Sequence, residues 1–192
     1  RLGFAPRGEC LTGRFRHEGI MLSEAVEVGL VVEKDHGGFK DRFFDRIMFP
    51  ITEPGGKITG FGGRVIDEGR PKYLNSPETP LFHKGSQIYG LGQARDGIRS
   101  NDRVVVVEGY LDVLALAQFG VTDAVATLGT ALTAEHLRLL GRYTRNVIAL
   151  FDGDKAGRNA AARGFEVFQQ VGLWGMAAFL PQGEDPDTFV RT

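Results

Sequence analysis

Acidic side chains follow three apolar stretches in the second half of the sequence. Asp152 and Asp154 come directly after one such stretch, Glu108 follows another, and a third leads to Asp185 and Asp187. In open parallel sheets, ligands bind beyond the carboxyl ends of the strands, so we expect these carboxylates to converge on one edge. Mg²⁺ takes oxygen ligands of this kind, and two such ions can clamp the attacking and leaving oxygens of a phosphoryl transfer. The pattern therefore predicts a Mg²⁺-dependent site that acts on phosphates.

Each acidic motif also has an ordinary interpretation. A D-x-D in a loop is most often a solvated turn, and the glycine between the two acids suits a turn with positive φ. The EF-hand calcium loop matches Asp152, Asp154 and Gly157, but Arg163 stands where a bidentate Glu is required, so that loop is excluded. Asp112 could be an exposed helix acid, and the "EDPD" stretch could be a solvated tail. Three acid clusters, each directly after a predicted strand, favour the metal site.

Strands and helices alternate from about residue 100 onward. The β-branched run at 103–109 predicts a strand buried on both faces, and further strands are expected within 122–129, 146–152 and 175–181. Helices are expected over 110–120, 133–144 and 156–172, with Thr133 as an N-cap and Gly172 at a C-terminus. The expected core-facing stripe of the first helix is Leu111, Leu114, Ala115 and Ala117. This alternation predicts a parallel α/β sheet with right-handed crossovers.

The first 100 residues are glycine-rich and irregular. Segments 46–51 and 57–65 predict a hairpin around the turn "TEPGG". Segment 69–85 holds three of the eight prolines and predicts an ordered loop, and 86–98 predicts a short helix. We therefore expect a smaller mixed α+β subdomain over residues 1–100, followed by a parallel α/β domain over residues 101–192.

Composition and charge restrict the remaining classes. The chain has 192 residues, 42% hydrophobic and 24% charged, which is enough for one good-sized core or two small ones. Its net charge of −1 gives no global basic field, so a polyanion would have to be held by a local patch or by metal ions. The single cysteine, Cys10, excludes an internal disulfide framework and suits a reducing cytoplasm. Together with the scattered histidines it also argues against a zinc site.

The ends and the hydropathy of the chain add two expectations. No apolar run approaches the roughly 20 residues that span a bilayer, and no signal peptide is recognisable, so no membrane association is expected. The chain begins "RLGFAPRG" without a methionine and stops at "DPDTFVRT", from which we expect a piece of a longer protein.

Two motifs resemble the TOPRIM domain: "VVEGYLDV", which contains Glu108, and "LFDGDKAG", which contains Asp152 and Asp154. DnaG-type primases share this domain with type IA and type II topoisomerases, some nucleases and recombination-mediator proteins. The segments "RIMFPI", "GFGGRV", "PKYLNSPETPLFHKG" and "YGL", with "LGTALT" and "GEDPDTF" later, resemble the catalytic core of bacterial DnaG primase. The resemblance runs from about residue 15 to the end, and "PKYLNSPETP" is its most specific part.

This resemblance implies a TOPRIM domain with a central parallel sheet flanked by helices, and a role in RNA-primer synthesis. The implied partners are a single-stranded DNA template, ribonucleoside triphosphates and the RNA–DNA hybrid product, with Mg²⁺ or Mn²⁺ as cofactor, in the cytoplasm at the replisome. The family's zinc-binding and helicase-binding domains have no counterpart in the sequence. We therefore expect no zinc site in this chain, and we expect the parent protein to bind the helicase through a domain outside it. Whether the chain polymerises ribonucleotides alone does not follow from the resemblance.

Site residues follow from the resemblance position by position. The family's acidic metal-binding positions are matched by Glu108, Asp152, Asp154, Asp185 and Asp187, the first three being the implied catalytic group. Asp152 would bridge metals, Glu108 would be either a ligand or a proton acceptor for the attacking 3′-hydroxyl, and Asp112 matches a further acidic position. Basic positions tied to nucleotide and template binding are matched by Arg64, Lys72 and Lys84, with Asn75 in the same motif. On residue type alone, these three cations would be ordinary surface charges.

Three other functions remain open at this point. A haloacid-dehalogenase-type phosphohydrolase also places a D-x-D after a buried strand, but there the motif comes early and continues into Thr or Val. A type IA topoisomerase needs a tyrosine nucleophile in a separate domain, and the four tyrosines here lie in ordinary segments; a TOPRIM nuclease is the related possibility. The third is a non-catalytic interaction module whose acids form a solvated face.

Overall fold

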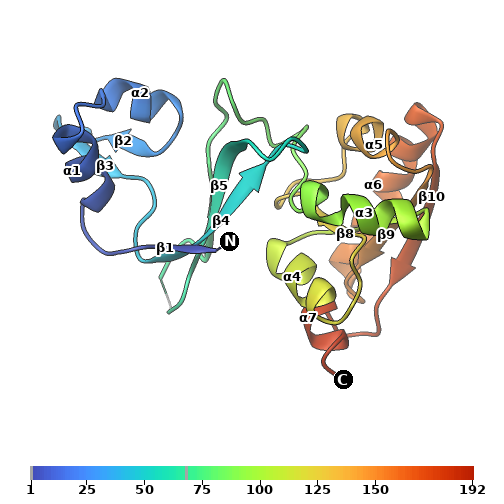
Figure 1. Cartoon of the computed structure of the whole chain (residues 1–192). Coiled ribbons are helices and arrows are strands. Elements are labelled where there is room, and N and C mark those ends of the chain that lie inside the picture. Colours follow the sequence, from blue (N-terminus) through green and yellow to red (C-terminus); the bar gives the residue numbers. More distant parts are fainter. Residues whose placement is uncertain (1, 68) are drawn as a thin grey trace. The chain divides into compact units, whose positions relative to one another are not determined.

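The chain forms two compact units, shown in a computed structural model that describes residues 2–67 and 69–192 (Figure 1). The first unit comprises Arg1–Thr52 and Lys57–His83, and the second comprises Glu53–Gly56 and Lys84–Thr192. The boundary predicted from the sequence lies near residue 100. The units divide earlier because the helix before residue 100 packs on the sheet of the second unit.

The first unit is built on a four-stranded antiparallel sheet in the order β1-β4-β5-β6. Its longest pair is β4 (Arg46–Thr52) and β5 (Ile58–Val65), the hairpin expected from the sequence, and β1 (Gly3–Ala5) and β6 (Tyr73–Asn75) flank it. A separate hairpin, β2 (Val31–Glu33) and β3 (Phe39–Asp41), lies beside α1 (Cys10–His17) and α2 (Leu22–Glu27). This part is a mixed α+β subdomain, as predicted.

Buried polar and small residues hold the first unit together. The Asp41 carboxylate accepts hydrogen bonds from the backbone N–H groups of Leu11 and Thr12, each at 2.7 Å, which caps the start of α1. In β5, a Cβ at Gly60 would lie 2.9 Å from the ring of the buried Phe82. The glycines of "GFGGRV" thus let large neighbours pack directly on the strand.

The second unit is a parallel α/β domain with the strand order β10-β9-β7-β8. Its elements in chain order are α3 (Leu91–Asn101), β7 (Val104–Val107), α4 (Tyr110–Gln118), β8 (Ala124–Ala126), α5 (Ala134–Leu140), β9 (Asn146–Phe151), α6 (Lys155–Val171), β10 (Trp174–Phe179) and α7 (Pro186–Phe189). Thr133 caps α5 and Gly172 ends α6, both as predicted. The parallel sheet flanked by helices confirms the predicted fold.

Alternating side chains of the central strands bury one face of this sheet. Val104 and Val106 of β7 pack with residues of α3, α5 and α6, among them Ile98, Leu137 and Phe168. Because side chains alternate along a strand, the neighbouring valines of β7 point to the other face, and helix α4 contacts the sheet through β8. Both faces of β7 are buried, as the continuous β-branched run predicted.

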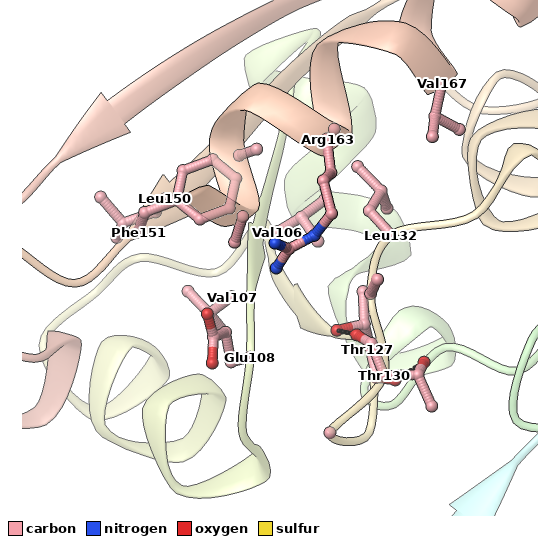
Figure 2. A pocket seen from close by; sticks show the side chains of 15 residues that line it. Val106, Val107, Glu108, Thr127, Thr130, Leu132, Leu150, Phe151, Arg163 and Val167 are labelled. Atoms are coloured by element: carbon pink, nitrogen blue, oxygen red, sulfur yellow. Dashed lines mark hydrogen bonds between the residues drawn. The ribbon is translucent and has the colours of Figure 1, made fainter. Parts of the chain in front are cut away.

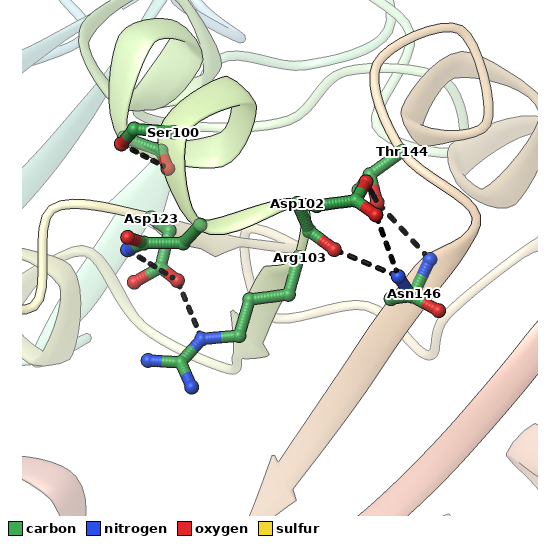
Figure 3. A network of polar contacts seen from close by, with 8 residues as sticks. Ser100, Asp102, Arg103, Asp123, Thr144 and Asn146 are labelled. Carbon is green, nitrogen blue, oxygen red and sulfur yellow. Dashed lines mark hydrogen bonds and ion pairs between the residues drawn. The ribbon is translucent and has the colours of Figure 1, made fainter.

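A polar network ties together the amino ends of the strands (Figure 3). Asn146, at the start of β9, donates to the backbone oxygen of Asp102 at 2.8 Å, and Thr144 donates to the Asp102 carboxylate at 2.9 Å. The fully buried Asp123, just before β8, accepts from Arg103 at 2.8 Å and from Asn101 at 3.1 Å. These contacts align β7, β8 and β9 at the edge opposite their carboxyl ends.

Four local predictions differ from the structure. The buried residues of α4 are Tyr110, Val113, Ala115 and Leu116, so the predicted stripe was wrong except at Ala115. Within the segment predicted to be a loop, Tyr73–Asn75 forms strand β6 because it pairs with β5. Helices α1 and α2 lie in a region that looked irregular, and α7 forms in the "EDPD" segment.

The helices described in the structure include none that is long and apolar enough to cross a membrane.

Candidate metal and nucleotide site

The acids that follow the two central strands lie close together. Strands β7 and β9 are hydrogen-bonded neighbours in parallel register, so Glu108 and Asp152 emerge side by side at their carboxyl ends. Burial raises the pKa of Glu108, and the charges of Asp152 and Asp154 raise it further. The electrostatic coupling among these three carboxyls is what the sequence pattern predicted for a shared edge.

The remaining acids join the same cluster through α4 and α7, which contact each other. Burial is the largest cause that raises the pKa of Asp112, to about 6, and Asp185, Asp152 and Asp187 add to the increase by repulsion. The hydrogen bond from the Gly109 N–H, at 3.1 Å, acts in the opposite direction. All six acidic positions singled out in the sequence therefore belong to one electrostatically coupled group.

The acidic "EDPD" segment follows the stretch Leu180–Pro181, which packs against Gly153 of the D-G-D turn. Burial raises the pKa of Asp152 first, and the charges of Asp185 and Asp154 raise it as well. Asp185 itself caps α7, since its carboxylate accepts from the Thr188 N–H at 2.8 Å, and Pro186 occupies the first turn. The "EDPD" segment is thus a capped helix start beside the other acids, rather than a solvated tail.

Two glycines set the geometry of the D-G-D turn. Gly153 has no positive φ, so the turn explanation offered by the sequence is wrong; a Cβ there would instead overlap the carbonyl oxygens of Leu180 and Pro181. A Cβ at Gly157 would overlap the carbonyl oxygen of Asp152 in the same way. Close backbone approach therefore explains both glycines and brings the chain after β10 against the D-G-D turn.

Carboxylates are the ligands of hard cations, but the described side chains are not arranged as a coordination shell. Within residues 2–67 and 69–192, no three of the acidic, histidine or cysteine side chains are arranged as a metal-ligand set. Asp154 caps α6 by accepting from the Gly157 N–H at 2.7 Å, and Asp187 accepts from Arg191 at 2.8 Å. Repulsion from neighbouring carboxylates helps to raise the pKa values of Glu108, Asp112 and Asp152. A divalent cation that takes oxygen ligands fits this cluster, because such a cation would remove the repulsion.

Three predicted nucleotide or template residues lie in the first unit, in the neighbouring strands β5 and β6 or directly before β6. Arg64 of β5 pairs with Tyr73 of β6, and its guanidinium lies 5.8 Å from the centre of the Tyr73 ring. The Lys72 ammonium lies 5.8 Å from the same ring. Asn75 is the last residue of β6, and its carbonyl oxygen accepts from Arg42 at 3.0 Å.

Lys84, the fourth predicted residue, belongs to the second unit. Its backbone carbonyl contacts the ring of His136, a fully buried residue at the start of α5, at 2.9 Å. The backbone at Lys84 is therefore anchored to the core of the parallel domain.

Arg64 and Lys72, with the residues around them, form what we call the basic surface of the first unit. The sequence did not single out two of its residues, Tyr73 and Arg70. Tyr73 is 43% exposed, and its ring lies within cation–π distance of Arg64 and Lys72. Arg70 lines a groove that Arg64 and Lys72 also line. Tyr73 could have been found from the sequence, because it is an aromatic residue next to Lys72 in the motif "PKYLN". Nothing in the sequence around Arg70 indicated a binding role.

Comparison with known proteins identifies both units. The family described as "DNA primase catalytic core, N-terminal domain" matches residues 1–95, and a Toprim-like family matches residues 105–190. The DNA primase of Escherichia coli strain K12 is 49% identical over 194 residues, which cover 99% of this chain and 33% of that protein. The chain thus spans about a third of the length of the curated relatives it matches.

Solved structures agree with this comparison. A DnaG primase catalytic domain bound to single-stranded DNA is 48% identical with a TM-score of 0.91, and the match covers 99% of this chain and 63% of that one. The RNA polymerase domain of Mycobacterium tuberculosis primase DnaG is 38% identical with a TM-score of 0.86, and the match covers 99% of this chain and 67% of that one. The chain therefore belongs to the bacterial DnaG-type DNA primases, of which it has the N-terminal domain of the catalytic core and the Toprim domain.

Proposed function

We propose that this chain carries the nucleotidyltransferase site of a replicative primase, which synthesises RNA primers on single-stranded DNA from ribonucleoside triphosphates. The observation that supports this most is the single coupled cluster of six acids at the carboxyl edge of the parallel sheet. A primase must bring a triphosphate and a 3′-hydroxyl together, and both the charge on the phosphates and the charge on the acids require divalent cations. Family membership favours this reaction over that of a topoisomerase, a nuclease or a phosphohydrolase.

Glu108, Asp152 and Asp154 are the proposed catalytic acids, and Asp185 and Asp187 would complete the set that holds Mg²⁺ or Mn²⁺. When bound, these ions supply charge neutralisation and Lewis acidity at the triphosphate. The chain's own contribution is to position these acids. Strands β7 and β9 end side by side, and the missing Cβ of Gly153 lets the chain after β10 lie against the D-G-D turn. Asp112, on the first turn of α4, would support the others by adding negative charge.

Glu108 is the candidate proton acceptor within this set. In primer extension the 3′-oxygen of the growing strand bonds to the α-phosphorus, pyrophosphate leaves, and the 3′-hydroxyl proton passes to a base. Burial is the largest cause that raises the pKa of Glu108, and Asp152 and Asp154 add to it in the chain without cations. Bound cations would remove the repulsion, so burial is the cause that would make this carboxylate a better proton acceptor than an exposed glutamate. The same carboxylate is also suited to ligate a cation, so the two roles need a kinetic test.

The basic surface of the first unit is the proposed nucleotide and template site. Two cations and one aromatic face lie together here: Arg64 in β5, Tyr73 in the adjacent β6, and Lys72 directly before β6. This combination binds phosphate and stacks on bases. The relative described as bound to single-stranded DNA supports a template role for this family. We propose Asn75 as a further nucleotide-binding residue of the first unit and Lys84 as a nucleotide-binding residue of the second unit. Helicase binding is proposed as a property of the longer protein.

Metal binding is the first test. Titration of the chain with Mn²⁺, followed by the electron paramagnetic resonance of free ion, should show binding that Asp152→Asn weakens by tenfold or more. Asp96→Asn, a change at an exposed acid of α3 in the same unit, is the matched control and should leave binding unchanged. Absence of Mn²⁺ binding even with a ribonucleoside triphosphate present would refute the proposed site.

Ribonucleotide incorporation is the second test. The chain, and a longer version that continues toward the full length of its relatives, are incubated with single-stranded DNA, ribonucleoside triphosphates and Mg²⁺. The longer protein should synthesise primers and lose this activity with Asp152→Ala, while circular dichroism shows an intact fold. Activity that survives this substitution would refute the assignment, and activity in the longer version alone would make the chain a binding fragment.

A further inference from the structure

A pocket of about 320 Å³ lies beside Glu108, on the side of the sheet covered by α6 (Figure 2). Its floor is apolar and comes from the central strands, with Val106 and Ala149 among the lining residues. The loop after β8 contributes Thr127 and Thr130, and α6 contributes Arg163. A volume of this size is at the lower end of pockets that hold small organic ligands.

Arg163 places the one positive charge among the residues that line this pocket. Figure 2 shows its side chain descending from α6 past Leu132 and Val106, with the guanidinium directed toward the Glu108 and Thr127 side of the pocket. In the described part of the chain, residues 2–67 and 69–192, no hydrogen bond or ion pair engages this guanidinium. An arginine above an apolar floor, with its planar fork available, is suited to bind a phosphate in bidentate fashion.

The loop between β8 and α5 makes one wall of the pocket rigid. The Thr127 and Thr130 hydroxyls each donate to the other residue's carbonyl oxygen, both at 2.9 Å. Between them Leu128 has φ +63 although it is not glycine, and its side chain is buried at 1% exposure. A left-handed leucine costs energy and persists only where its surroundings enforce it, which is a property of preorganised binding sites.

The same loop is tied to the backbone of the acidic edge. The Thr127 N–H donates to the Val107 carbonyl at 3.2 Å, and the Gly129 N–H is 3.4 Å from the Glu108 carbonyl. A ligand that contacts this wall therefore lies next to the strand end that positions Glu108. The pocket and the proposed metal site share Glu108, with Arg163 supplying the opposite charge.

We propose that this pocket is a phosphate-binding subsite of the polymerisation site, in which Arg163 binds a nucleotide phosphate next to Glu108. This proposal rests on the proposed function for its nucleotide chemistry, and it assigns a role to a residue outside the acidic motifs. The phosphate comes either from a ribonucleoside triphosphate or from the sugar–phosphate backbone of a nucleic acid. In both cases two phosphate oxygens can accept the paired hydrogen bonds of the guanidinium, so separate binding assays must distinguish the two sources.

The test compares Arg163→Gln with Arg163→Lys and Arg99→Gln. Glutamine removes the charge and keeps a good helix former in α6, lysine restores the charge without the planar fork, and Arg99 is an exposed arginine of α3 that does not line the pocket. The probes are adenosine triphosphate, inorganic triphosphate and a single-stranded DNA oligonucleotide, each titrated in EDTA and again with Mg²⁺. Circular dichroism confirms that every variant is folded.

We expect Arg163→Gln to weaken binding of one probe class by about tenfold, with partial recovery in Arg163→Lys and no change in Arg99→Gln. Weaker binding of both adenosine triphosphate and inorganic triphosphate would identify the incoming nucleotide as the source of the phosphate. Weaker binding of the DNA oligonucleotide alone would identify the nucleic-acid backbone as the source. Unchanged affinity for all three probes overturns the proposal. Mn²⁺ binding, measured separately, should be retained in Arg163→Gln. If the chain binds no Mn²⁺ but Arg163→Gln still weakens phosphate binding, the proposed function is refuted and the phosphate subsite stands.

Discussion

Replacing Asp112 by Asn should stabilise this chain at neutral and alkaline pH. The pKa of Asp112 is raised from 3.8 to about 6, chiefly by burial and then by the acids around it. A carboxyl whose folded-state pKa is raised contributes stability that is complete below about pH 4 and is lost as the pH rises through about 6. The charged form is therefore the one that destabilises the fold.

The size of the effect follows from the shift. A rise of about two pKa units corresponds to about 3 kcal/mol as an upper limit. Because this carboxyl is partly exposed, solvent screening reduces the expectation to about half of that value. We expect Asp112→Asn to raise the free energy of unfolding by about 1.5 kcal/mol near pH 8, and by roughly half as much near pH 5, where part of the Asp112 population is protonated.

Urea unfolding in EDTA, followed by circular dichroism near pH 8 and near pH 5, measures this gain. The replacement amide retains an oxygen that can accept from the Gly109 N–H, so the cap of α4 is preserved. Asp96→Asn removes a charge from a side chain that is 87% exposed and should change stability by less than about 0.5 kcal/mol at either pH. Added Mg²⁺ should shrink the Asp112→Asn gain, because bound cations remove the repulsion. A gain of the same size at both pH values, or no gain, would refute the electrostatic argument.

Three further outcomes follow from the packing and the basic surface. Gly153→Ala should lower the urea midpoint and weaken Mn²⁺ binding by tenfold or more, because its Cβ would displace the chain after β10. Gly164→Ala, inside α6, should keep binding and add up to about 1 kcal/mol of stability, because its Cβ would meet only the Phe151 ring, at 4.0 Å. Asp123→Ala should cost about 1 kcal/mol in urea unfolding, because the hydrogen bonds that Asn101 and Arg103 donate to this fully buried carboxylate are lost while both exposed donors regain water, and no measurable loss would contradict this. Tyr73→Leu should weaken binding of single-stranded DNA in fluorescence anisotropy by about fivefold or more while Tyr73→Phe retains it, and equal affinities would remove stacking from the account.

The sequence predicted the parallel domain well because its signals were local and strong. The run before Glu108 is β-branched throughout, and Thr133 and Gly172 are ordinary helix-terminal residues, so β7, α5 and α6 appear where expected. The convergence of the acids followed from one topological rule about strand ends. What could not be read locally was the neighbour of Gly153, since the carbonyl oxygens that require a glycine come from Leu180 and Pro181.

The first unit was harder to predict because its elements are short and depend on distant contacts. Helix α1 has a mixed composition, and its start is capped by Asp41, about thirty residues away in the sequence. Strand β6 has three residues and exists through its pairing with β5. In α7 the signal was present, since Asp185 before Pro186 is a standard helix start, but four residues give no periodicity to detect.

The network at the amino ends of the strands has a consequence for how the parallel domain moves. Asp102, Asn146 and Thr144 join the α3–β7 and α5–β9 connections, while Asp123 and Arg103 join β7 to β8. The opposite edge carries repelling acids instead. Amide hydrogen exchange should therefore run as a gradient along β7 and β9, slowest at the joined base and fastest at the acidic rim. Such a gradient would give the rim freedom to adjust to cations and nucleotides while the base retains the register of the strands.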